Sequence, residues 1–376
     1  MVAPLLRQQL SFSAIGYAHV VFSFFLGYTI GQALDGKLID KIGSRRGMLA
    51  CVALWSVVCM FHGLAVGVVT LGILQFLLGI AEAGNWPGGV KVVAENFPPA
   101  RRAFATGIFN SGSSLGAVLA PPLVATIVWT WGWRPMFVVV GATGLAWVCV
   151  WYRVYRKAPA PAGDHAFSAP PRVFSLPTLL TDRAVWGLMV NRFLSDPIWW
   201  FYAFWLPQYL TQSRGFSLTQ IGQTAWVPFA FAGAGGWCGG FASDALVRRG
   251  VAPVKARKIV MVIGSCLMLC GLPAFQVRSN ALALALISVV VFGFTGWSSN
   301  ILSIATDFFP AETVGQVTGL GGTAAAIGGM LFTLATGWLV QNISFGSVFV
   351  VTSGMTLCAV VVIVWFLPRA HRSETA

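Results

Sequence analysis

Residues 36–46 read GKLIDKIGSRR, and they join two long apolar stretches of the chain. The same pattern returns 204 residues later, where residues 240–249 read GFASDALVRR. A second pair of segments, around Phe97-Pro98 and Phe309-Pro310, repeats at an offset of 212 residues. Internal similarity at a fixed offset is typical of a repeated architecture, so the sequence predicts two related halves.

The composition predicts that both halves lie in a membrane. Apolar residues make up 57% of the 376 residues and charged residues 9%, against about 25% charged in soluble proteins. A helix needs about 20 apolar residues to cross a bilayer. We therefore predict an all-α polytopic membrane protein with eleven spans near 14–34, 48–68, 70–92, 103–128, 135–152, 184–210, 220–243, 259–277, 281–306, 314–340 and 345–367.

The net charge of +13 encodes topology rather than a nucleic-acid site. When alternate loops are compared, one side of the membrane holds only Arg7, Arg134, Arg214 and Arg278, while most other Lys and Arg fall on the opposite side. Basic loops are cytoplasmic, which places the C-terminus in the cytoplasm. The seven cysteines lie in predicted spans without metal-ligand spacing, so we expect no metal and no cofactor.

The two predicted halves are unequal. We predict an N-terminal bundle over 1–152, a Pro- and Ala-rich cytoplasmic linker over 153–183, a C-terminal bundle over 184–367 and a cytoplasmic tail over 368–376. Two spans precede the repeated motif in the second half but only one in the first, so we expect that the first of twelve helices is missing. Met1–Leu6 would then be its outer end, as a late-called start codon or a truncated gene would produce.

The repeated motif predicts a cytoplasmic latch. A carboxylate at a helix end beside arginines forms charge-assisted bonds that can break when the halves move apart. The alternative is that these residues only form a solvated basic loop, with no role as a latch. The candidate latch residues, which we place in short loops, are Gly36, Asp40, Arg45, Arg46 and Asp244.

Glu82 and the residues after it predict a transport site. An ionisable side chain midway along a span is functional by default, and burial favours the neutral carboxyl, so Glu82 can load and release a proton. Pro87 frees a backbone carbonyl, Asn85 offers donors and an acceptor, and Trp86 offers a flat face. The alternatives are a neutral, backbone-bonded Glu82 and a packed kink.

Three other polar positions are less decisive. Arg192 and Asp196 stand i,i+4 in a predicted span and can simply neutralise each other. Lys91 lies nearer the cytoplasmic end of its span, where it can snorkel or serve as the cation for a substrate carboxylate.

The motif at 36–46 resembles the signature of the major facilitator superfamily. The segments at 79–89, 94–98, 107–114, 196–207 and 296–300 resemble the hexuronate transporters of the anion:cation symporter family. The resemblance implies two pseudo-symmetric helical bundles, proton-coupled symport of a sugar acid by alternating access, a bacterial inner membrane and a monomer.

The resemblance also implies roles for particular residues. A glutamate at the place of Glu82 takes part in proton coupling in the family, and Tyr28 and Gln32 match positions that face the cavity. We expect Tyr28, Gln32, Asn85 and Asn300 to bind hydroxyl groups and Trp297 to stack on the ring. The sequence departs from relatives at Gln75, where they commonly carry an arginine that contributes to anion binding.

Three alternatives stay open at this point. The substrate can be another organic anion, such as galactonate, glucarate or an aromatic acid. The chain can be a truncated remnant that no longer transports, as the missing helix and Gln75 favour. A membrane enzyme is the least favoured of these alternatives, because the loops hold no Ser-His-Asp set and the chain has only four histidines.

Overall fold

The computed structural model describes residues 6, 9–12, 14–155 and 174–366. The described residues form helices joined by short connections, without a strand. Most of the predicted linker, the predicted tail at 368–376 and nearly all of Met1–Leu6 lie outside them. The helices are α2 (Ala14–Ile42), α3 (Ser44–Phe61), η1 (His62–Leu64), α4 (Val68–Ala83), α5 (Asn85–Asn96), α6 (Pro99–Trp131), α7 (Trp133–Val154), α8 (Leu176–Thr181), α9 (Arg183–Gln212), α10 (Leu218–Thr224), α11 (Trp226–Arg248), α12 (Pro253–Met268), α13 (Gly271–Gln276), α14 (Asn280–Phe308), α15 (Val314–Asn342) and α16 (Phe345–Phe366).

Each predicted span coincides with one helix or with two consecutive helices, which confirms the predicted fold class. In the described part of the chain, seven of these segments are long and apolar enough to cross a membrane by length and composition alone. They are Ser44–Leu64, Val68–Asn96, Trp133–Val154, Pro253–Gln276, Asn280–Phe308, Val314–Asn342 and Phe345–Phe366. The remaining predicted spans correspond to α2, α6, α9 and the pair α10–α11.

The repeated motif lies within helices and not in a loop, so this part of the prediction is wrong. Helix α2 continues through Asp40 to Ile42, and α11 continues through Asp244 to Arg248. Gly43 alone separates α2 from α3, with a φ of 85°. Glycine adopts this left-handed conformation without steric penalty, so one residue reverses the chain and both helices extend past their apolar stretches.

Side-chain caps explain where several other helices begin. The Asp182 carboxylate accepts a hydrogen bond from the Ala184 N–H at 2.6 Å before α9, and Ser279 caps α14 through the Leu282 N–H. Ser217 and Gln220 form a reciprocal capping box at α10. These partners satisfy N–H groups that the first helical turn leaves without a carbonyl.

The chain divides into two compact units. Unit 1 comprises Met1–Asn96, Leu119–Val173 and Ala311–Thr323, and unit 2 comprises Phe97–Val118, Phe174–Pro310 and Ala324–Ala376. Each unit therefore includes a short segment from the other half of the sequence, namely the first part of α15 in unit 1 and the first part of α6 in unit 2.

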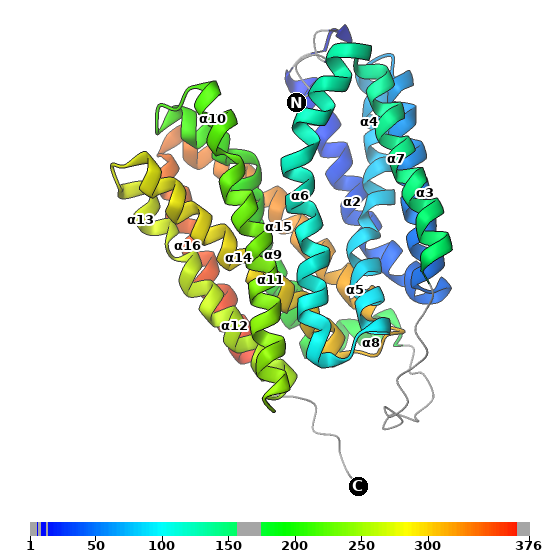
Figure 1. The fold of residues 1–376 in the computed structure, drawn as a ribbon, viewed down its shortest axis with the longest axis vertical. Helices are drawn as coiled ribbons and strands as arrows, with labels where there is room; N and C mark the ends of the chain where they lie inside the picture. Colours follow the sequence, from blue (N-terminus) through cyan, green and yellow to red (C-terminus); the bar gives the residue numbers. More distant parts are fainter. Residues whose placement is uncertain (1–5, 7–8, 13, 156–173, 367–376) are drawn as a thin grey trace. The chain divides into compact units, whose positions relative to one another are not determined.

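In unit 1, α2 packs along α4 and α3 packs along α7 (Figure 1). Glycines make the first contact close: a Cβ at Gly27 would collide with the Phe76 carbonyl, and one at Gly31 would lie 2.7 Å from the Ile80 carbonyl oxygen. Small residues allow such backbone contact between membrane helices, where van der Waals packing replaces the hydrophobic drive.

In unit 2, α14 packs against both α11 and α12 (Figure 1). An aromatic cluster joins α9 to α16, where Phe201, Tyr202 and Tyr209 contact Phe349 with ring centroids 5.0–6.1 Å apart. The aromatic side chains of residues 199–205 are spread around α9, since Tyr202 is buried and Phe204 is exposed.

Candidate functional site

Glu82 stands near the end of α4 with its side chain exposed, although its neighbours Ala81 and Ala83 are buried. Helical geometry turns successive side chains by about 100°, so the packed face of α4 holds the alanines and Glu82 points away from it. The carboxyl lies close enough to Cys59 of α3 to interact electrostatically.

A break in the helix follows Glu82. Helix α4 ends at Ala83 and α5 begins at Asn85, with Gly84 between them. Pro87 has no N–H to donate to the Ala83 carbonyl, which is the hydrogen bond that would continue the helix. The proline thus accounts for the break in the helix. Asn85 and Trp86 are half-buried at this break.

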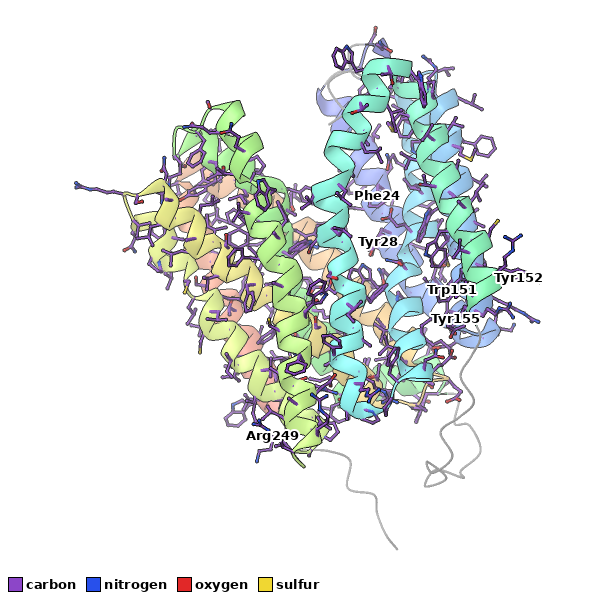
Figure 2. All side chains as sticks on the ribbon, in the orientation of Figure 1. Phe24, Tyr28, Trp151, Tyr152, Tyr155 and Arg249 are labelled. Carbon is purple, nitrogen blue, oxygen red and sulfur yellow. The ribbon has the colours of Figure 1, made fainter. Side chains whose placement is uncertain are left out.

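The two predicted site residues of α2 differ in exposure. Tyr28 is half-buried and stacks on Phe24, with ring centroids 5.8 Å apart (Figure 2). Gln32 is only 1% exposed and packs against the backbone of Gly322 in the first part of α15. Its Oε1 atom has no hydrogen-bond partner among the described residues, so Gln32 is enclosed in this conformation.

The predicted site residues of α14 are enclosed as well. Trp297 is 1% exposed and Asn300 is fully buried. Asn300 Nδ2 donates to the carbonyls of Gly296 at 2.8 Å and Gly239 at 3.2 Å. Within the described chain, Asn300 Oδ1 and Trp297 Nε1 have no partner. Their predicted contacts with substrate stay predictions, because neither side chain is open to a ligand here.

A polar cluster in unit 1 surrounds Asp40, and we call it the Asp40 cluster. Its carboxylate accepts hydrogen bonds from the N–H groups of Gly315 at 3.1 Å and Gln316 at 2.6 Å, in the first turn of α15. Lys91 of α5 binds Asp40 Oδ1 at 2.7 Å and donates to the Ala311 carbonyl at 2.8 Å. The cluster joins residues from both halves of the sequence.

The structure corrects two predictions about this cluster. Lys91 is 2% exposed and paired, so of its two predicted alternatives snorkelling is excluded, while contact with a substrate carboxylate stays a prediction. Arg45 was expected to pair with Asp40, but it donates to the Tyr152 carbonyl at 2.7 Å and lies over the Tyr152 ring at the end of α7. Arg46 is exposed. Helix α3 turns both arginines away from α2, whereas Lys91 approaches Asp40 from α5.

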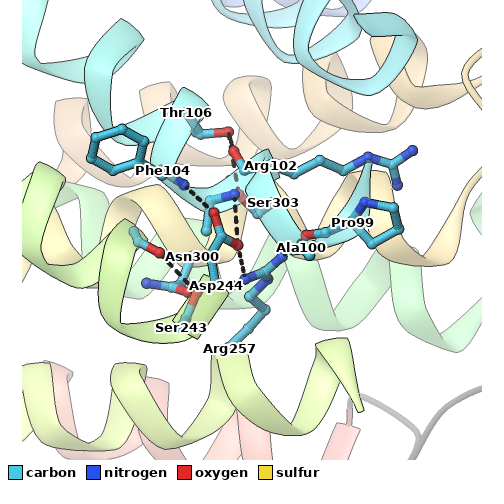
Figure 3. Close-up of polar contacts among 12 residues, drawn as sticks. Pro99, Ala100, Arg102, Phe104, Thr106, Ser243, Asp244, Arg257, Asn300 and Ser303 are labelled. Carbon is cyan, nitrogen blue, oxygen red and sulfur yellow. Dashed lines mark hydrogen bonds and ion pairs between the residues drawn. The ribbon is translucent and has the colours of Figure 1, made fainter. Parts of the chain in front are cut away.

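A matching cluster in unit 2 surrounds Asp244, and we call it the Asp244 cluster (Figure 3). The Asp244 carboxylate accepts hydrogen bonds from the N–H groups of Phe104 at 2.8 Å and Ala103 at 3.3 Å. Arg257 of α12 binds Asp244 Oδ1 at 2.5 Å, and its Nη2 donates to the Pro99 carbonyl at 2.6 Å. Arg257 also contacts Asp307 at 3.2 Å.

The two clusters correspond position by position under the sequence repeat. The backbone groups that Asp244 and Arg257 bind, at 99, 103 and 104, lie 212 residues before those that Asp40 and Lys91 bind, at 311, 315 and 316. The cations do not correspond, because the repeat equivalent of Lys91 is Ser303. Sequence reasoning therefore found both aspartates but missed Arg257 and the pairing of Lys91.

Sequence reasoning also missed Asp35. Its side chain is buried in α2, and a Cβ on Gly84 would lie 3.3 Å from its Oδ2 atom. In the described residues this oxygen has no hydrogen-bond partner. The signal was its place in the same helix, five residues before Asp40, which the predicted loop hid.

Comparisons with known proteins agree with this architecture. The model of the Major Facilitator Superfamily matches residues 1–333 and 255–376. The hexuronate transporter of Escherichia coli (strain K12) is 30% identical over 391 residues, which cover 100% of this chain and 90% of that protein. The D-galactonate transporter of Escherichia coli O6:H1 is 28% identical over 366 residues, covering 91% of this chain and 84% of that protein.

A solved structure, the proton:xylose symporter XylE bound to 6-bromo-6-deoxy-D-glucose, shares the fold with a TM-score of 0.77 at 16% identity, over 98% of this chain and 91% of that chain. The predicted family is thus confirmed by a match along the whole chain, by named transporters as relatives and by a multi-helix membrane architecture. The chain is a member of the major facilitator superfamily, a family of membrane transporters and not of enzymes.

Proposed function

We propose that this protein is a secondary active transporter that carries a hexuronate-like sugar acid together with protons by alternating access. We place it in the inner membrane of a bacterium, as a monomer with a cytoplasmic C-terminus. The substrate class is supported by a relative that is named a hexuronate transporter and is aligned over the whole chain. The observation that carries proton coupling is the acidic side chain of Glu82, an exposed residue within an apolar span.

The position of Glu82 supports coupling for an energetic reason. A charged side chain that faces hydrocarbon midway across a bilayer costs several kcal/mol, and ionisable residues in spans therefore face the bundle interior or a water-filled path. A carboxyl on such a path takes up a proton from the side with water access and releases it when access changes. Glu82 precedes the break at Gly84, so a change in the angle between α4 and α5 would move it.

The substrate residues that we propose are Tyr28, Gln32, Asn85, Trp86, Trp297 and Asn300. Tyr28, Asn85 and Trp86 are half-buried and can meet a ligand in the present conformation. Gln32, Trp297 and Asn300 are enclosed, with polar atoms that lack partners in the described chain. A buried polar atom without a hydrogen bond is unfavourable, so a conformation that opens these residues to sugar hydroxyls would satisfy them.

The Asp40 and Asp244 clusters are the proposed latches. Each aspartate lies in the last two turns of a helix of one sequence half and binds backbone N–H groups in the first two turns of a helix from the other half, α15 or α6. Negative charge is favourable at a helix N-terminus, and separation of the helices would break the backbone bonds and the ion pair together. Gly36 belongs to the first latch, because a Cβ there would collide with the Gly315 carbonyl.

Gradient-driven uptake tests the proposal. Labelled glucuronate should accumulate in proteoliposomes with an inward proton gradient, and Glu82→Gln should lower accumulation to the level without a gradient while glucuronate exchange persists. Glu312→Gln is the matched control, because Glu312 is an exposed carboxylate between helices. Gradient-driven accumulation that survives Glu82→Gln would contradict the coupling role.

Another organic anion is the second candidate substrate, because one relative is named a D-galactonate transporter. Competition of galactonate, glucarate and an aromatic acid against labelled glucuronate ranks these candidates. Stronger competition by any of them than by unlabelled glucuronate would make that anion the preferred substrate.

A further inference from the structure

Arg192 is the deepest cation in the described part of the chain. It stands nine residues after the start of α9, about 13 Å along the helix at 1.5 Å per residue. Every other described Lys or Arg within a helix lies no more than five residues from a helix end. A cation at this depth is expensive and functional by default, and neither latch uses it.

The pairing of Arg192 differs from that of the latches. Its Nη2 and Nε atoms bind Asp196 Oδ2 at 2.8 and 3.1 Å, and Ser195 donates to Asp196 Oδ1 at 3.1 Å. The side chains of Arg192 and Asp196 are 11% and 17% exposed, whereas both members of the Arg257–Asp244 pair are 0% exposed. The α9 pair is therefore reachable from outside the packed core.

Trp199 extends the same side of α9. Residues at i, i+4 and i+7 lie on one helix face, so Arg192, Asp196 and Trp199 line up over two turns. Trp199 is half-buried and is held by Phe294, with stacked rings 5.9 Å apart, and by Phe229 at 6.0 Å. This face is distinct from the packed face of Ile198 and Tyr202 and from the exposed face of Trp186 and Phe204.

We propose that this face of α9 recognises the sugar acid, with the carboxylate on Arg192, hydroxyl groups on Asp196 and the C–H face of the ring on Trp199. The inference rests on the proposed function and specifies its substrate as a monocarboxylate. A guanidinium has five N–H donors in a planar fork, so Arg192 can bind one substrate carboxylate through charge-assisted bonds while it keeps Asp196. The second carboxylate of an aldarate would meet Asp196, which repels it.

Calorimetric binding to the purified full-length chain tests this assignment. The probes are glucuronate, its neutral analogue glucuronamide and the dicarboxylate galactarate. The wild type should bind glucuronate about 10- to 100-fold more tightly than glucuronamide, because a hydrogen bond to a charged group contributes about 1.5–3 kcal/mol. Arg192→Gln should abolish this preference and Arg192→Lys should keep most of it, while Asp196→Asn should admit galactarate.

Two further variants control the result. Arg192→Gln leaves Asp196 without its cation, which can destabilise the fold. The double variant Arg192→Gln/Asp196→Asn leaves no charge unpaired, so its preference between the two ligands reports on binding and not on folding. Arg183→Gln changes an exposed arginine at the start of the same helix and should bind like the wild type.

A folded double variant that still prefers glucuronate over glucuronamide would overturn the α9 assignment and leave the proposed transport untouched. A wild-type chain that binds neither hexuronate nor aldarate would overturn the proposed substrate class, and with it this inference.

Discussion

The buried ion pair between Asp40 and Lys91 makes a quantitative prediction. In Asp40→Asn, Lys91 stays buried and keeps its hydrogen bond to the Ala311 carbonyl, and the new amide N–H₂ group competes with backbone N–H donors for the same space. In Lys91→Gln, Asp40 keeps its two backbone bonds but loses its cation. Removing one member of a buried pair costs about 3–5 kcal/mol, because the other charge is left uncompensated.

This loss is measurable as a shift in thermal unfolding of the detergent-solubilised protein. An unfolding entropy of about 2.1 cal/mol/K per residue gives about 0.8 kcal/mol per °C for a chain of this length. Each single substitution should therefore lower Tm by about 4–6 °C. The double variant Asp40→Asn/Lys91→Gln should lose less than the sum of both, with a coupling free energy of about 0.5–3 kcal/mol.

The matched control is Lys37→Gln, an exposed lysine of the same helix, which should shift Tm by less than about 1 °C. Additive losses in the double variant would refute a direct interaction between Asp40 and Lys91. Single variants that melt like Lys37→Gln would refute the stabilising contribution of the whole cluster.

The remaining predictions concern the other latch and the helix contact beside the first. Arg257→Gln should destabilise more than Asp244→Asn, because it leaves Asp244 without its cation and Asp307 with only the longer Arg102 pair at 3.8 Å, whereas Asp244→Asn leaves Arg257 paired with Asp307. The order of the two melting temperatures checks this, and the reverse order would contradict it. Gly36→Ala should lower the unfolding free energy by about 1–3 kcal/mol, because its Cβ overpacks against the Gly315 carbonyl; an unchanged melting curve would show that α2 and α15 can separate without loss.

The positions of the helices could be predicted from sequence because a bilayer imposes one length scale on apolar stretches. Helix ends were harder to predict, since α2 runs on through Asp40 once Gly43 supplies the reversal. Hydropathy does not report which side of a helix packs, because lipid and protein interior are equally apolar. For that reason Trp297 and Asn300 could be placed on a span but not on its packed face.

The site was predictable to the extent that it follows the repeat. Asp40 and Asp244 were found because the backbone around them is duplicated, and each carboxylate binds N–H groups at equivalent positions of α15 and α6. Arg45 was mistaken for the partner of Asp40 because it is near in sequence, while Lys91 reaches Asp40 from a helix 51 residues away. Proximity along the chain carries little information about which helices are neighbours in a bundle.

The contrast between aspartates and cations has a physical cause. A carboxylate that caps a helix must reach two N–H groups whose spacing is fixed by the backbone, so its position is constrained to one residue at the end of the neighbouring helix. A cation needs only to reach one carboxylate oxygen and one carbonyl, and a long side chain can do so from any adjacent helix. Lys91 on α5 and Arg257 on α12 are two solutions to the same requirement, each on Oδ1 of its aspartate and on the carbonyl at position 311 or 99. The carboxylate and the carbonyl acceptor therefore recur in both halves, whereas the cations differ, and only the acceptors could be recognised by comparing the halves.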